Sequence, residues 1–228
     1  MKKIIYNRFL KEWLGDLPKV TYNKPIFVIT TPQETEKAVK YLLSMPILGV
    51  DTETRPAFNR SQQFKCSLLQ VATPHNCFLF RLNFTGMTTA IIRLLEDTTV
   101  PKIGLSWHDD IRALKQLHDF NPGWFIDLQD HMREIGIEDL SLQKMYANLF
   151  EERISKTERL SNWERDVLTS KQMSYAAIDA WACIRLFEEL RELENTGNYE
   201  LRNVEIEQEI EEEFKIYEEL AAQKGQGG

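Results

Sequence analysis

The sequence predicts one α/β domain built on a mixed β-sheet flanked by helices, with an added amphipathic, acidic helix near the C-terminal end. Three observations predict this fold class. Short apolar runs come early in the chain, two of them are joined by a hairpin signal, and later runs alternate with stretches of helical periodicity. The length of 228 residues allows one substantial core, and the hydrophobic fraction of 43% is ordinary for a globular protein.

Six short apolar runs are expected to form strands, because turn residues or polar segments bound each of them. They cover residues 26–31, 47–52, 67–71, 77–80, 102–105 and 125–127. The turn residues Pro74-His75-Asn76 separate the third run from the fourth, so these two strands are expected to pair as an antiparallel hairpin.

Apolar residues three and four positions apart predict helices between these strands. The first helix follows Pro32, a residue favoured at the first helical position, after a threonine that can cap the helix. A second helix is expected at about residues 88–95, and a third begins at about Asp110. Beyond residue 127 the chain has mainly helical periodicity.

The charge is unevenly distributed, which divides the chain into three regions. We expect a basic N-terminal extension at 1–24, a main domain at 25–198 and an acidic helical tail at 199–228. The tail carries −6 of the net charge of −7. The basic extension suits contact with a nucleic-acid backbone, and a solvated helix face is the alternative interpretation.

The acidic tail contains one apolar stripe with helical spacing. Its members are Ile206, Ile210, Phe214, Tyr217 and Leu220. We expect this stripe to pack on the domain itself, and self-association or a protein partner is the alternative. The last residues, from Gln223 onward, are expected to fray.

Composition also excludes some classes of protein. Apolar runs are too short for a membrane span, and charged residues interrupt the N-terminal segment, unlike a signal peptide. The three cysteines are odd in number and widely spaced, which indicates a reducing compartment without disulfides. We therefore expect a cytoplasmic protein.

The first candidate site is a pair of carboxylates at the end of a buried strand. Asp51 and Glu53 follow the apolar run at 47–50. Residues i and i+2 of a strand point to the same face, so these two side chains are expected to lie together. Like charges in a buried place repel, and a hard divalent cation such as Mg²⁺ removes that cost.

Two further segments carry chemistry. Tyr175 and Asp179 are four residues apart in an otherwise apolar helical stretch, so they share one helix face. Asp109 and Asp110 follow a short strand where a helix begins, and either could interact with the helix dipole. Each segment alone also has a purely structural interpretation.

Taken in order, these segments resemble the tyrosine-bearing branch of the DEDD 3′→5′ exonucleases, the group of ribonuclease D and the Werner-type exonucleases. The first motif, D-x-E, matches Asp51 and Glu53. The second selects Asp110, which has an apolar residue four positions later. The third, Y-x-x-x-D, matches Tyr175 and Asp179, and the resemblance covers roughly residues 26–190.

The segment before the third motif extends the resemblance. Ser161-Asn162-Trp163 precedes the tyrosine motif as in the Werner and ribonuclease D groups, and Lys156 lies seven residues before Trp163. Asp166 and Val167 replace the Arg-Pro common in the ribonuclease D group. A larger apolar residue is frequent in relatives where this chain has Ala57, which leaves Phe58 as a substitute.

The resemblance implies a ribonuclease H-like fold and hydrolysis of nucleic acid from its 3′ end with two divalent ions, Mg²⁺ or Mn²⁺. It implies that Asp51, Glu53 and Asp179 hold one ion beside the attacking water. Asp51 would bridge to the second ion, which Asp110 also holds. Tyr175 would orient the water, and nucleoside 5′-monophosphates would be released.

Substrate contacts are predicted beside these five residues. The candidates are Thr52, Thr54, Phe58 and Trp107, with Phe64 as a further aromatic side chain. The expected partner is single-stranded or 3′-ended nucleic acid. The Ser161-Asn162-Trp163 segment favours DNA, while RNA processing of the ribonuclease D type and a non-catalytic nucleic-acid-binding module are the alternatives.

Overall fold

The computed structural model of the protein describes residues 2–59 and 61–208. It contains a six-stranded sheet of order β2-β5-β4-β3-β6-β7 and a separate two-stranded sheet of β1 and β8. The strands are β1 (Lys3–Tyr6), β2 (Ile26–Ile29), β3 (Leu48–Thr54), β4 (Cys66–Ala72), β5 (Cys77–Arg81), β6 (Lys102–Gly104), β7 (Phe125–Asp127) and β8 (Tyr199–Arg202). The helices are α1 (Pro32–Leu42), α2 (Leu82–Thr85), α3 (Thr89–Glu96), α4 (Trp107–Lys115), α5 (Leu128–Glu134), α6 (Leu142–Phe150) and α7 (Ser170–Thr196), with a 3-10 turn at Glu12–Leu14.

The large sheet is mixed, as the sequence predicts. Strand β4 runs antiparallel to both of its neighbours, β3 and β5. The other neighbouring strands, β2–β5, β3–β6 and β6–β7, are parallel. The predicted hairpin is therefore confirmed, and the strand that carries Asp51 and Glu53 lies inside the sheet.

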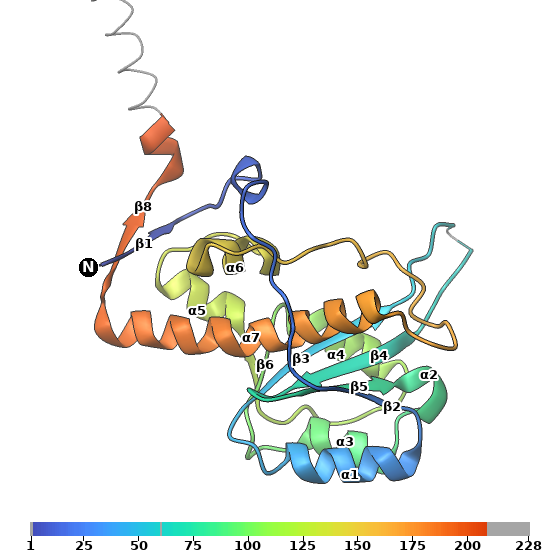
Figure 1. Cartoon of the computed structure of the whole chain (residues 1–228). Coiled ribbons are helices and arrows are strands. Elements are labelled where there is room, and N and C mark those ends of the chain that lie inside the picture. The colour runs from blue at the N-terminus through green and yellow to red at the C-terminus, as the bar shows by residue number, and fades with distance from the viewer. Residues whose placement is uncertain (1, 60, 209–228) are drawn as a thin grey trace, which may run out of the picture.

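Helices cover both faces of this sheet (Figure 1). Helices α1 and α3 pack on one face and the long helix α7 crosses the other, with α5 and α6 beside it. Side chains alternate along β4 accordingly: Leu69 and Val71 belong to the core under α1 and α3, whereas Leu68 packs beneath α7. The α7 layer brings the small side chains of Ala176, Ala177 and Ala180 close to the sheet that bears the carboxylates.

A local signal explains where α1 begins, whereas α4 begins earlier than predicted. The side chain of Thr31 accepts from the backbone N–H of Glu34, and the Glu34 carboxylate accepts from the Thr31 N–H, which forms the capping box expected before Pro32. Helix α4 begins at Trp107, three residues before the predicted start. Asp110 therefore lies at the end of the first turn of α4.

The N-terminal segment differs from the expected helix or free basic arm. Residues 3–6 form β1, which pairs in parallel with β8 from the predicted acidic tail. Lys3 forms an ion pair with Glu189, and Arg8 pairs with Glu138 and Glu205 at 2.6 and 2.9 Å. These basic side chains thus meet carboxylates of the same chain, one on α7, one between α5 and α6, and one in the C-terminal segment.

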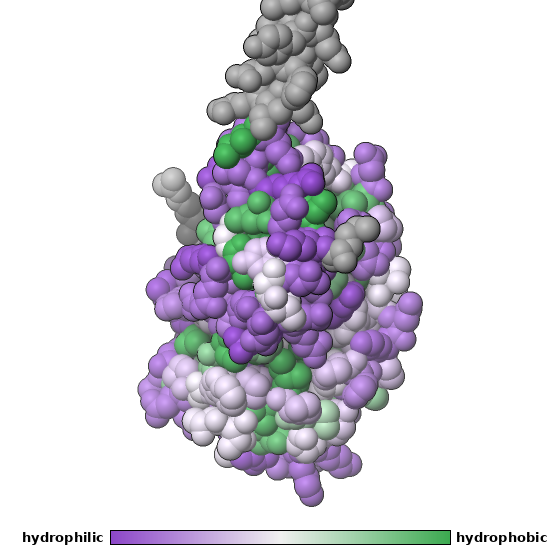
Figure 2. Space-filling model, turned by 90° about the vertical axis from the view of Figure 1, so that its left-hand side faces the viewer, coloured by the Kyte–Doolittle hydropathy of each residue, from purple (hydrophilic) through white to green (hydrophobic). Residues whose placement is uncertain are grey.

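The surface beside β1 and β8 is mostly polar. Hydrophilic residues prevail on this side of the molecule, and apolar residues form small patches (Figure 2). Ile4, Leu201 and Ile206 are among the exposed apolar side chains. Residues 204–208 are helical, and the rest of the predicted apolar stripe lies outside the described residues.

Two further expectations concern the whole chain. Within residues 2–59 and 61–208, every helix is too short or too polar to cross a membrane. Cys66, Cys77 and Cys183 are all buried free thiols, as the sequence predicts.

Candidate active site

Two carboxylates project from the end of β3 towards α7. Gly49, Asp51 and Glu53 alternate along β3 and so share one face of the sheet. A Cβ atom at Gly49 would lie 1.9 Å from the carbonyl oxygen of Ala180. The absence of a side chain at Gly49 thus allows α7 to approach β3 closely, which brings Asp179 beside the two acids of the strand.

Asp51, Glu53 and Asp179 form a compact group of carboxylates. One ligand oxygen from each lies within 4.8 Å of the others. Burial, Asp110 and Asp179 raise the pKa of Asp51 well above its ordinary value. Burial and the neighbouring Asp51 raise the pKa of Glu53 to about 10, and burial raises the pKa of Asp179 to about 7. The three groups therefore resist carrying negative charge together.

Asp110 lies next to this group, on α4. Its carboxylate accepts a hydrogen bond from the hydroxyl of Thr52, the residue between the two acids of β3. Burial raises the pKa of Asp110 to about 6. The side chain of Asp109, by contrast, is 86% exposed and forms an ion pair with Arg112, at 3.4 Å. The geometry thus places Asp110, and not Asp109, with the other carboxylates.

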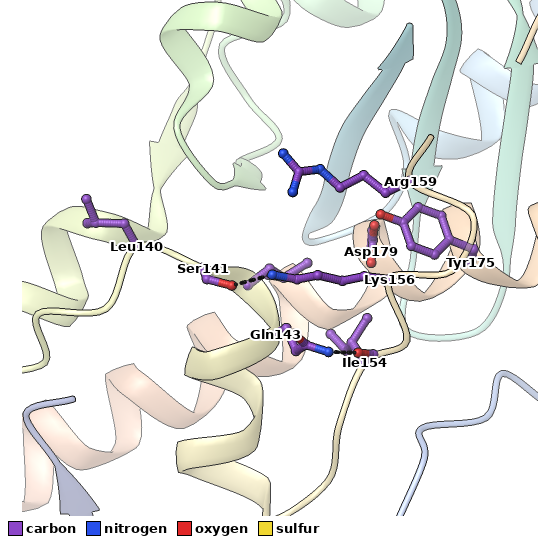
Figure 3. A pocket seen from close by; sticks show the side chains of 9 residues that line it. Leu140, Ser141, Gln143, Ile154, Lys156, Arg159, Tyr175 and Asp179 are labelled. Atoms are coloured by element: carbon purple, nitrogen blue, oxygen red, sulfur yellow. Dashed lines mark hydrogen bonds between the residues drawn. The ribbon is translucent and has the colours of Figure 1, made fainter. Parts of the chain in front are cut away.

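Tyr175 stands one turn before Asp179 on α7, and its hydroxyl points towards the Asp179 carboxylate (Figure 3). Burial and the charges of Asp179 and Glu53 raise the pKa of the Tyr175 phenol above its ordinary value of 10. The phenol is therefore protonated at neutral pH and can act as a hydrogen-bond donor.

A pocket of about 310 Å³ opens beside Tyr175 and Asp179. Lys156 and Arg159 extend along it from the loop before α7, opposite Ser141 of the segment that leads into α6 (Figure 3). The Lys156 ammonium donates to the Ser141 hydroxyl at 3.1 Å. Burial and the nearby Arg159 lower the pKa of Lys156. Two cationic side chains thus line the approach to the carboxylates.

The loop that carries these cations is held from below. The Gln172 amide donates to the Ser161 hydroxyl at 2.8 Å and to the Asn162 carbonyl at 3.1 Å. The buried Arg81 guanidinium donates to the carbonyls of Arg165 and Asp166. Gln172 and Arg81 therefore hold in place the loop segment that extends the family resemblance.

The predicted substrate contacts have different surroundings. Phe58 is 76% exposed and can meet a base, and Thr54 lies partly buried at the end of β3. Trp107 is only 4% exposed: its indole N–H donates to the Ile126 carbonyl at 3.2 Å, and its ring packs against Phe125. The Trp107 ring is therefore packed in the core, and this placement does not support its predicted stacking on a terminal base.

The donor set fits a hard divalent cation. Carboxylate oxygens are the ligands that Mg²⁺ and Mn²⁺ prefer, and four carboxyl groups meet at this end of the sheet. The raised pKa values of Asp51 and Asp179 point the same way, because a bound cation would replace the protons that otherwise relieve the repulsion.

Arg159 and Asp127 were missed in the sequence. Arg159 lies three residues after Lys156 in the loop, and its charge opposes part of the rise in the pKa of Glu53 that burial and the neighbouring acids cause. Asp127 ends β7 and accepts backbone N–H groups from the start of α4. Two signals were available. Arg159 is a basic residue close to Lys156, and Asp127 is an acid at the end of the strand that pairs with the strand of Gly104.

Similar structures share this architecture. The exonuclease domain of Nibbler from Aedes aegypti matches with a TM-score of 0.71 at 16% identity, over 79% of this chain and 95% of that one. Ribonuclease D of Escherichia coli matches with a TM-score of 0.65 at 20% identity, over 75% of this chain and 46% of that one. The fold is ribonuclease H-like, as expected.

Sequence comparisons identify relatives. A 3′-5′ exonuclease of Arabidopsis thaliana is 26% identical over 203 residues, which cover 78% of this chain and 67% of that protein. The mouse bifunctional 3′-5′ exonuclease/ATP-dependent helicase is 26% identical over 157 residues, 66% of this chain and 11% of that protein. This chain therefore spans a variable and often small part of its relatives. The profile of the 3′-5′ exonuclease family matches residues 26–194, which include all five predicted catalytic positions, and the chain belongs to that family.

Proposed function

We propose that this chain removes nucleoside 5′-monophosphates from the 3′ end of a nucleic acid by hydrolysis of the terminal phosphodiester bond. One observation carries the proposal: three carboxylate oxygens lie within 4.8 Å of one another, beside a tyrosine hydroxyl and a pocket lined by two cations. Repelling carboxylates favour cation binding, and cations near the pocket favour a phosphate-rich substrate.

The carboxylates have separable tasks in this proposal. Asp51, Glu53 and Asp179, whose ligand oxygens lie close together, would hold one Mg²⁺ or Mn²⁺ ion, and Asp110 together with Asp51 would hold a second. When bound, the two ions activate water and neutralise charge on the phosphate that is attacked. The protein's own contribution is to keep four carboxyl groups in fixed places before the ions arrive.

The remaining polar groups orient the reactants. Tyr175 keeps its proton, so it positions the attacking water by a hydrogen bond and does not serve as a base. Lys156 and Arg159 attract the substrate backbone and offset its charge at the entrance of the pocket. Phe58, exposed on the loop after β3, stacks on a terminal base of any identity.

We propose DNA as the first substrate to test and RNA as the second. The segment Ser161-Asn162-Trp163 supports DNA because of its likeness to the Werner group. Among similar structures, ribonuclease D of Escherichia coli is described as an exoribonuclease involved in structured RNA processing, and that of Trypanosoma brucei is bound to RNA. Matched DNA and RNA oligonucleotides therefore decide between the two.

The test uses 5′-labelled single strands, Mg²⁺ and the Asp51→Asn variant. We expect the wild-type chain to shorten the oligonucleotide one residue at a time from its 3′ end and the variant to lose this activity. The matched control is Asp109→Asn, since the Asp109 side chain is exposed and lies outside the carboxylate group. Wild-type activity in Asp51→Asn would refute the assignment, and binding without cleavage by the wild type would indicate a nucleic-acid-binding module.

The acidic C-terminal tail carries a separate proposal. We propose that residues 209–228 support self-association or bind a protein partner through the predicted apolar stripe, and that the protein works in the reducing cytoplasm. The test is a deletion of the tail and a measurement of the oligomeric state. The deletion should begin at residue 209 and spare Val204 and Glu205, because these two residues contact Asn7 of the N-terminal segment. An unchanged oligomeric state after this deletion would remove the assembly role.

A further inference from the structure

The helix that carries Asp110 is not capped by the side chain of the residue that precedes it. Ser106 occupies the position before α4 in a left-handed conformation, with φ of 58°, and its side chain makes no capping hydrogen bond. A carboxylate from another strand takes that place. Asp127 accepts hydrogen bonds from the backbone N–H groups of Ser106 and Trp107, both at 3.1 Å.

Further contacts join the same turn to β7. Asp127 also caps α5, accepting from the backbone N–H of Gln129 at 3.0 Å, and the Gln129 amide donates to the Ser106 hydroxyl. Gly104 pairs with Asp127 across the two strands, and a Cβ atom there would lie 2.5 Å from the ring of Trp107. The start of α4 is thus fixed against β7, both through the backbone and through the packed indole ring.

A second contact reaches Asp110 from the opposite side. The hydroxyl of Thr52 donates to the Asp110 carboxylate. Thr52 lies between Asp51 and Glu53 on β3, and its side chain points to the other face of that strand. The carboxylate of Asp110 is therefore tied to β3, while the helix that bears it is tied to β7.

We propose that Asp127 and Thr52 are positioning residues that set the Asp110 carboxylate, and with it the site of the second divalent ion. The inference rests on the proposed function, which places Asp110 at that ion. A helix whose first N–H groups lose their acceptor can shift or fray at its first turn, where Asp110 lies. A carboxylate without its hydrogen-bonding partner loses its fixed orientation towards a metal.

The test counts bound Mn²⁺ ions in the whole chain, by electron paramagnetic resonance, in the presence of an oligonucleotide with a 3′-terminal phosphorothioate that resists cleavage. We expect two ions in the wild type. We expect Thr52→Val and Asp127→Ala to weaken the second ion about 10- to 100-fold and to leave the first unchanged. Thr52→Ser keeps the hydroxyl and should restore the second ion.

Matched controls separate positioning from loss of charge or of folding. Asp109→Ala removes an exposed acid from α4, and Asp130→Ala removes one from α5, where the side chain is 75% exposed. Both should bind two ions. Thr52→Val changes neither charge nor helix capping, so it remains informative if Asp127→Ala fails to fold.

Three outcomes are distinguishable. Loss of the second ion alone in Thr52→Val, with rescue by Thr52→Ser, supports the inference. Two ions of wild-type affinity in both Thr52→Val and a folded Asp127→Ala overturn it, while the proposed function stands. A wild-type chain that binds no Mn²⁺ and cleaves no substrate overturns both.

Discussion

The metal-free protein should become more stable when one of its crowded carboxylates is replaced. Asp179 is 6% exposed, and burial raises its pKa to about 7 from an ordinary value of 3.8. A carboxyl with a raised pKa binds more protons in the folded state than in the unfolded state. Proton binding to Asp179 therefore stabilises the folded state fully below pH 3.8, and this stabilisation is lost as the pH rises through about 7.

The magnitude follows from the difference in pKa. A shift of one pKa unit corresponds to about 1.4 kcal/mol, so the rise for Asp179 corresponds to a destabilisation of about 4 kcal/mol once the pH exceeds 7. Asparagine has a similar shape and does not titrate, although its buried amide needs partners of its own. We therefore expect Asp179→Asn to raise the free energy of unfolding at pH 8 by about 2–4 kcal/mol, or the melting temperature by roughly 5–10 °C.

The assay is thermal unfolding in EDTA at pH 4, 6 and 8, repeated at pH 8 with 10 mM Mg²⁺. Asp179→Asn should exceed the wild type at pH 8, approach it at pH 4 and gain little from Mg²⁺, whereas the wild type should gain clearly. Asp109→Asn, an exposed acid on α4, should behave as the wild type does. Equal stability of Asp179→Asn and wild type at pH 8 without metal would refute the reasoning.

Three further changes test other parts of the site. Tyr175→Phe should lower the cleavage rate about 100-fold or more while Mn²⁺ binding persists, because only the hydroxyl beside Asp179 is lost; an unchanged rate would exclude water positioning. Gly49→Ala should lower the free energy of unfolding in urea by about 3 kcal/mol or more, since its Cβ atom would meet the Ala180 carbonyl at 1.9 Å, and a wild-type midpoint would contradict that close packing. Phe58→Ala should weaken oligonucleotide binding by about 1–3 kcal/mol without loss of stability, because the ring is 76% exposed, and unaltered affinity would remove it from the substrate path.

The placement of Asp51 and Glu53 could be predicted because it depends on local geometry alone. An apolar run of four residues indicates a buried strand, and the two-residue period of a strand puts both acids on one face. The structure extends β3 through both residues to Thr54. What the local pattern did not contain is the closeness of Asp179, which requires α7 to lie directly on Gly49.

The terminal sheet was missed because its partners are almost 200 residues apart. Residues 3–6 and 199–202 are short and only partly buried, and neither run alternates clearly between apolar and polar side chains. Parallel pairing leaves no hairpin signal, since the two strands are not joined by a turn. Nothing in the sequence assigned Lys3 a partner, whereas the structure pairs its ammonium group with the Glu189 carboxylate on α7.

The distinction between Asp109 and Asp110 could have been made on physical grounds if the start of α4 had been placed correctly. With the helix beginning at Trp107, positions 107, 110 and 114 follow the spacing i, i+3 and i+7 and share one face. Trp107 and Leu114 are both buried, so Asp110 between them turns inward to Thr52, and Asp109 turns about 100° away towards solvent. Ser106 stands at the capping position but makes no capping hydrogen bond, and Asp127 from another strand accepts the backbone N–H groups of Ser106 and Trp107 instead. An acid on the buried face of an amphipathic helix is therefore a candidate site residue, and a helix start whose own cap residue makes no capping hydrogen bond directs attention to a distant acceptor such as Asp127.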